Sequence, residues 1–155
     1  NEARAIRPYS AIEFPEFFGN PATTVQTLYA ERTFWEKATI LHQEAHRGPE
    51  KPLPPRYSRH YYDLFRMDQS PVGVKALNRP DLLDDVAKFK MRFYRCPWAH
   101  YENAKPGTLR LVPPGHHFDE LRKDYSSMQS MLFGDVPSFD RIMSGISMLE
   151  SRINN

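Results

Sequence analysis

Apolar residues recur every three or four positions along most of the chain, the spacing that places them on one face of an α-helix. The pattern predicts helices over residues 22–47, 58–69 and 80–95, and another around 121–132. The last helix has the clearest apolar stripe, made of Phe139, Ile142, Ile146, Leu149 and Ile153. The fold class we expect is therefore all-α in the main, a bundle of about five helices.

Proline and glycine separate these helices. The connector GPEKPLPP at 48–55 cannot be helical inside, and SPVG at 70–73 is expected to stop the second helix. Residues 1–21 contain three prolines and predict at most a short strand followed by irregular chain. A second short extended segment, TLRLV, is expected at 108–112. We therefore divide the chain into an irregular lead-in, 1–21, and a helical domain, 22–155.

Composition narrows the classes of protein that fit. A chain of 155 residues, 40% of them hydrophobic, can bury one core, and its longest apolar runs are too short to span a bilayer. The single cysteine, Cys96, cannot form an internal disulfide and suits a reducing cytoplasm. We expect its thiol to be either in the core or semi-buried. The net charge is only +2, so any contact with nucleic acid must be local.

The segment HQEAH places His42 and His46 four residues apart, on one face of the first predicted helix. A zinc-protease motif needs glutamate directly after the first histidine, whereas Glu44 comes two residues later, and no third ligand is evident. We expect these histidines to face solvent at the helix end, and we expect the same of His116 and His117. No metal site is predicted.

The segment KFKMRFYR mixes cations with aromatic residues. On a helix, Phe89 and Phe93 fall on the expected core stripe, whereas Lys88, Arg92 and Arg95 form a stripe of their own. A solvated helix face explains this pattern, and contact with RNA or a protein partner is the alternative.

Two further segments, ERTFWEK and SRHYYDL, carry charges among apolar neighbours. Lys37 sits beside Phe34 and Ala38, so either its stem crosses the edge of the core with the ammonium in water, or the ammonium is held near an anion. The ordinary interpretation treats the charges around it as exposed ion pairs within single helices, Arg32 with Glu36 and Arg59 with Asp63.

In order along the chain, ERTFWEKATILH, SRHYYDL, AHYENAKPGTLRLVPP and LRKDYSSMQSMLFG resemble the C-terminal half of the AbiEii/AbiGii-type nucleotidyltransferase toxin family, over nearly all of 22–154. That family looks like a branch of the polymerase-β-type nucleotidyltransferases. The resemblance implies a parent protein that transfers a nucleoside monophosphate from an NTP to an RNA acceptor such as tRNA, as the toxin of a toxin–antitoxin pair.

The resemblance also implies roles for four side chains. Lys37 takes the place of the lysine in the third family motif and Asp63 that of the aspartate in the fourth, which makes both candidate catalytic residues. Arg32 and Arg59 become candidate contacts to substrate. Many members have Lys-Asp where this chain has Arg59 and His60, so the role of that acidic position is not carried over.

The family's N-terminal domain carries a Gly-Ser turn and a D-x-D strand, whose paired carboxylates hold Mg²⁺. Neither motif occurs in this chain, and Asp84 and Asp85 are adjacent on a predicted helix, where they diverge. We therefore expect this chain to be a fragment that lacks the N-terminal domain, and residues 1–21 to be the last part of that domain. We expect the fragment to be inactive alone and not to bind the parent's Mg²⁺ and NTP tightly. Expected partners are the missing domain, RNA and an antitoxin, with no membrane. The alternative is a non-catalytic helical module that binds protein or RNA.

Overall fold

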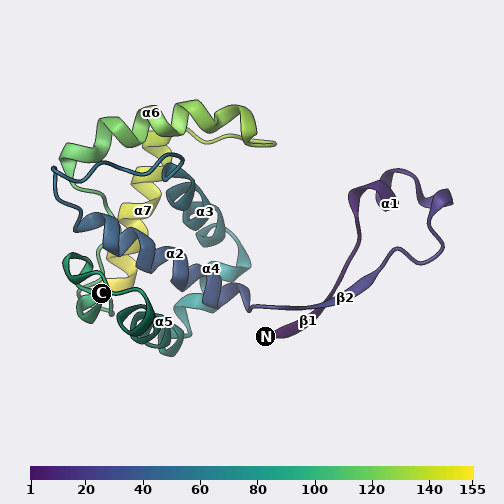
Figure 1. Cartoon of the computed structure of the whole chain (residues 1–155), viewed down its shortest axis with the longest axis horizontal. Helices are drawn as coiled ribbons and strands as arrows, with labels where there is room; N and C mark the ends of the chain where they lie inside the picture. The colour runs from purple at the N-terminus through teal and green to yellow at the C-terminus, as the bar shows by residue number, and fades with distance from the viewer. The chain divides into compact units, whose positions relative to one another are not determined.

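The computed structural model describes all residues, Asn1–Asn155, as two compact units, residues 1–30 and 31–155 (Figure 1). The second unit is helical, and the first contains the only sheet. The expected fold class, mainly α with a short strand near the N-terminus, is confirmed. None of the helices has the length and apolar character required to cross a membrane.

The first unit is a two-stranded ribbon. Strand β1 (Glu2–Ile6) pairs with antiparallel β2 (Thr23–Thr27), and between them lie α1 (Tyr9–Glu13) and the 3₁₀ turn η1 (Pro15–Phe17). The expected helix start near residue 22 is therefore wrong. The segment TTVQT is rich in β-branched residues, which favour a strand, and β1 supplies the partner that a local pattern cannot reveal.

Six helices make up the second unit, with four 3₁₀ turns on the connections between them. The helices are α2 (Ala30–Ala45), α3 (Ser58–Asp68), α4 (Pro71–Leu77), α5 (Pro80–Phe93), α6 (Phe118–Met128) and α7 (Phe139–Asn154). The turns are η2 (Pro97–Ala99), η3 (Tyr101–Asn103), η4 (Gly115–His117) and η5 (Gln129–Met131). Helix α3 contacts α4, α6 and α7, which makes it the centre of the unit.

The helix α4 was not expected, because SPVG looked like a helix stop. Ser70 does end the preceding segment, but its hydroxyl then accepts a hydrogen bond from Val72 N at 3.2 Å, and Pro71 occupies the first turn of a new helix. A Cβ atom on Gly73 would lie 2.6 Å from the carbonyl oxygen of Asp68, so only glycine allows α3 and α4 to meet this closely.

The core contains the predicted stripe of α7, whose five apolar positions are all buried. Trp35 joins α2 to the α4–α5 corner, because its indole N–H lies 3.1 Å from the carbonyl oxygen of Ala76 and 3.0 Å from that of Arg79. These contacts fix the part of α2 that carries the candidate site.

The segment 108–112 is irregular rather than a strand. Its backbone N–H groups bond to side chains: Leu109 N to Asn154 Oδ1 at 3.1 Å, and Leu111 N and Val112 N to the carboxylate of Glu150. Side chains of α7 therefore satisfy the polar groups that a neighbouring strand would satisfy in a sheet.

Candidate functional site

Lys37 on α2 reaches across to α3. Its Nζ donates to Oδ2 of Asp63 at 2.7 Å and lies 3.2 Å from Nδ1 of His60. Lys37 and Asp63 each precede a fully buried residue of their helix, Ala38 and Leu64, so both side chains leave from the edge of the core. The Lys37 side chain is 21% exposed and that of Asp63 38%. Both side chains are therefore only partly covered by the protein.

His60 is the uncharged member of this cluster. Burial, followed by the charges of Lys37 and Arg59, lowers the pKa of His60 from 6.5 to about 4. An ammonium can only donate, so the neutral ring accepts at Nδ1 and carries its proton on Nε2. Lys37 has three N–H bonds and hydrogen bonds to two protein acceptors, His60 and Asp63.

The two candidate arginines do not join this hydrogen-bonded cluster. Arg32 pairs with Glu36 at 3.3 Å within α2, as the spacing predicted. Arg59 is exposed on α3, and the expected pair between Arg59 and Asp63 is wrong, since Asp63 pairs with Lys37 from the other helix. Arg59 still lies near enough for its charge to act on His60.

The histidines of HQEAH do not both face solvent, and that expectation is wrong. His42 is completely buried: its Nδ1 accepts from Arg110 N at 3.0 Å and its Nε2 lies 3.1 Å from the carbonyl oxygen of His100. His46 is partly buried, with Nδ1 2.8 Å from the His42 carbonyl oxygen. His42, near the end of α2, therefore has a structural role: it holds the segment that follows α5 through these two contacts.

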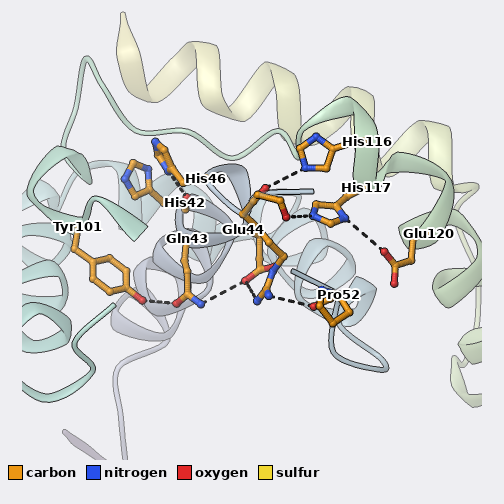
Figure 2. Close-up of polar contacts among 11 residues, drawn as sticks. His42, Gln43, Glu44, His46, Pro52, Tyr101, His116, His117 and Glu120 are labelled. Carbon is orange, nitrogen blue, oxygen red and sulfur yellow. Dashed lines mark hydrogen bonds and ion pairs between the residues drawn. The ribbon is translucent and has the colours of Figure 1, made fainter. Parts of the chain in front are cut away.

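A second polar network holds the proline-rich connector to the same end of α2 (Figure 2). Buried Glu44 pairs with Arg47 at 2.6 Å, and Arg47 also donates to the Pro52 carbonyl at 3.1 Å. His117 is buried, contrary to expectation, with Nε2 3.3 Å from the Gly48 carbonyl oxygen, whereas His116 is exposed as expected. No group of three or more His, Cys, Asp or Glu side chains in the chain is placed to hold a metal ion.

A pocket of about 370 Å³ opens beside the lysine cluster. Its lining comes from α2, α5, η3, the residue before α3 and the residue after α5: Glu36, Ile40, Gln43, Tyr57, Val86, Phe89, Lys90, Tyr94 and Tyr101. Glu36 precedes Lys37, and the Tyr57 ring contacts that of His60 with 4.8 Å between centroids. The pocket and the lysine cluster are therefore neighbours.

Lys90 is the functional candidate that the sequence pattern missed. Burial lowers its pKa to about 8, and its Nζ lies 3.5 Å from the Glu36 carbonyl oxygen and 5.5 Å from the centre of the Tyr101 ring. The buried face of α5 is formed by Leu83, Val86 and Ala87. Lys90 lies four residues after Val86, on this face, and that spacing was the available signal.

The buried face of α5 also corrects the expected core stripe. Phe89 and Phe93, assigned to the core, are 43% and 60% exposed. The expected semi-buried thiol is found: Cys96 is partly buried, and burial raises its pKa, which disfavours the reactive thiolate.

Comparison with known families decides the classification. The family described as nucleotidyl transferase AbiEii toxin, Type IV TA system, matches residues 2–145. The chain belongs to the AbiEii family. The resemblance seen in its motifs is confirmed, and the match includes the strand ribbon as well as the helices. No curated protein and no solved structure matches the chain. AbiEii membership indicates a nucleotidyltransferase toxin of a toxin–antitoxin system.

Proposed function

We propose that this chain supplies the lysine and aspartate side of the catalytic cleft of an AbiEii nucleotidyltransferase, which transfers a nucleoside monophosphate from an NTP to an RNA end. The observation that carries the proposal is the 2.7 Å hydrogen bond from Lys37 to Asp63. This hydrogen bond joins the two residues that the family resemblance indicated, the lysine on α2 and the aspartate on α3.

Lys37 would bind the triphosphate through its remaining N–H. Its positive charge would offset the negative charge that shifts onto the leaving phosphates during transfer. Asp63 and neutral His60 would hold the ammonium in place from one side, so that no reorganisation is needed when substrate arrives. Arg32 and Arg59 would add positive charge at the same edge and contact phosphates of the NTP or the RNA.

The carboxylates that hold Mg²⁺ are proposed to lie on a separate nucleotidyltransferase domain outside this chain, because the sequence contains neither the Gly-Ser turn followed by a strand nor the D-x-D motif of the family. When bound, Mg²⁺ would offset negative charge on the NTP phosphates. Without that domain, we expect this chain to be inactive and to bind Mg²⁺ and NTP weakly.

The exposed apolar side chains of the first unit, residues 1–30, favour the proposal of such a partner domain. A two-stranded ribbon is marginally stable by itself, and this one exposes large apolar side chains, among them Tyr9 at 86%, Phe17 at 78% and Ile12 at 57%. We propose that the missing domain covers them. We further propose a cytoplasmic location and a cognate antitoxin, consistent with the toxin–antitoxin family.

The test uses the longer protein that carries a Gly-Ser turn and a D-x-D strand ahead of this chain. It should transfer label from an NTP to RNA, and the present chain alone should not. A longer protein without those motifs and without transfer would instead favour the alternative, a non-catalytic module that binds protein or RNA.

A further inference from the structure

The pocket beside Lys37 has an aromatic rim. Phe89 lines the pocket, and its ring centre lies 4.8 Å from that of Phe93 and 6.0 Å from that of Tyr94. All three side chains are substantially exposed, at 43%, 60% and 63% respectively. Exposed aromatic rings in contact with one another are unusual on a surface that only faces water, and they mark a binding surface.

The pocket itself has the size and the lining of a ligand site. Its volume of about 370 Å³ lies within the roughly 300–1,000 Å³ typical of small-molecule sites. Tyr57, Phe89 and Tyr101 supply aromatic surface, and Gln43 and Lys90 supply polar groups among them. Tyr101 is held by its hydroxyl, which donates to Gln43 Oε1 at 2.5 Å, so part of the wall is fixed before a ligand binds.

Charge around the rim favours an anion. Lys90 lines the pocket, and Arg92 and Arg95 follow on the exposed surface of the same segment. The Arg92 guanidinium lies 5.2 Å from the centre of the Phe93 ring, so a cation and an aromatic face occur together. Of the acidic groups, Glu36 pairs with Arg32 and Asp84 pairs with Lys88.

We propose that this pocket takes up an unpaired base of single-stranded RNA, that Phe93 and Tyr94 stack on the neighbouring base, and that Arg92 and Arg95 contact its phosphates. Stacking on aromatic side chains beside cations is the chemistry by which proteins bind single strands without sequence readout. A strand fits better than a free nucleotide, because Phe93, Arg92 and Arg95 lie outside the lining of the pocket and are exposed.

This inference deepens the proposed function and rests on it in one respect: the bound strand would be the acceptor. The pocket adjoins the lysine cluster through Glu36 and through the contact of Tyr57 with His60. A strand lying along α5 would therefore present its end next to Lys37. Binding of the strand, unlike transfer, requires neither Mg²⁺ nor NTP.

The test measures binding of a fluorescein-labelled single-stranded RNA of about eight nucleotides, a length within the usual site size, by anisotropy. Phe89→Ala and Tyr94→Ala should each weaken binding about tenfold, a loss within the range expected when a base no longer stacks on one aromatic residue. Phe133→Ala is the matched control: Phe133 is 92% exposed and lies outside the pocket, so this variant should bind like the unmodified chain. Arg92→Gln should also lower the dependence of binding on salt.

Three results would overturn the proposal: no binding of the single strand, equal binding by the Phe89→Ala and Phe133→Ala variants, or binding of a duplex or a single nucleotide as tight as that of the strand. Circular dichroism of each variant checks that the exposed substitutions leave the fold intact. Because the assay contains no NTP, failure of the transfer reaction would leave its outcome unchanged. Conversely, a failed binding test would leave Lys37-dependent transfer standing.

Discussion

The ammonium of Lys37 and the carboxylate of Asp63 meet at 2.7 Å although the residues are 26 positions apart and lie on different helices. Both side chains remain partly exposed, at 21% and 38%. An ion pair this open to solvent adds little to the free energy of folding. The stability of the fold therefore does not account for this pair, which agrees with the role proposed for Lys37 in binding phosphate.

The first prediction follows from that exposure. Lys37→Ala should change the free energy of unfolding by about 1 kcal/mol or less. It should also raise the pKa of His60, because the charge of Lys37 is the largest cause, after burial, of its low value. Urea unfolding measures the first effect and NMR titration of the His60 ring the second. An unchanged His60 pKa would show that the Lys37 charge does not act on the ring in solution.

The second prediction concerns acid stability. The pKa of His42 is about 4 in the folded chain, lowered chiefly by burial, against 6.5 as its ordinary value. Between these values the unfolded chain binds more protons, so stability is complete above pH 6.5 and falls as the pH drops toward 4. His42 alone should cost about 2 kcal/mol at pH 5. His60 should add to this loss, since its pKa is lowered in the same direction.

The control for this prediction is His42→Gln, measured by urea unfolding at several pH values. The variant loses the hydrogen bond from Arg110 N, so it should be less stable at pH 7, but its stability should depend less on pH below 6.5. An equal pH dependence in the variant and the unmodified chain would show that His42 is not the group that titrates.

The third prediction concerns Lys90. Its pKa of about 8, lowered by burial, means that a neutral amine is present at mildly alkaline pH, whereas most lysines are still charged. Trace labelling with an acylating reagent, read by mass spectrometry, should show half-maximal reactivity of Lys90 near pH 8. Lys105, exposed in a turn, serves as the internal reference. If Lys90 showed no enhanced reactivity relative to Lys105 at that pH, burial in the pocket would be refuted.

The fourth prediction concerns Asp124, which fixes the start of α3. Its carboxylate accepts from Arg56 N at 2.6 Å and from Ser58 N at 2.9 Å, and Arg56 adopts a positive φ of 61°. Asp124→Ala should cost about 2 kcal/mol, because the hydrogen bonds to a charged acceptor are lost. Asp119→Ala, on the exposed surface of α6, should cost much less in urea unfolding. Equal losses would mean that the carboxylate does not hold the start of α3.

The spacing of apolar residues predicted the structure correctly where a helix buries one face. All five apolar positions predicted for α7 are buried. This spacing failed to predict the structure where a distant partner decides it. The strand β2 needs β1, and Asp63 pairs with Lys37 from another helix rather than with Arg59, four residues away on its own helix. His42 likewise looked exposed because its partners, His100 and Arg110, lie far along the chain.

The candidate site divides in the same way. The spacing of residues alone allowed two interpretations of Lys37, an ammonium in water or an ammonium held near an anion. The family motifs, rather than the helical period, indicated that Asp63 belongs to the same candidate site. The pocket was hidden because the expected stripe of α5 ran through Phe89 and Phe93, whereas the buried face runs through Leu83, Val86 and Lys90. Rotation of a helix by about one residue moves its aromatic side chains from the core to the surface.

The most direct measurement of the central claim uses a protein in which the proposed nucleotidyltransferase domain precedes this chain, and records the rate at which it transfers a labelled nucleoside monophosphate from an NTP to RNA. Lys37→Ala should lower this rate by about 100-fold or more, the typical loss when one charge-stabilising donor is removed. Lys123→Ala, an exposed lysine on α6, should retain the unmodified rate. Equal rates for the two variants, with both folded, would contradict the account.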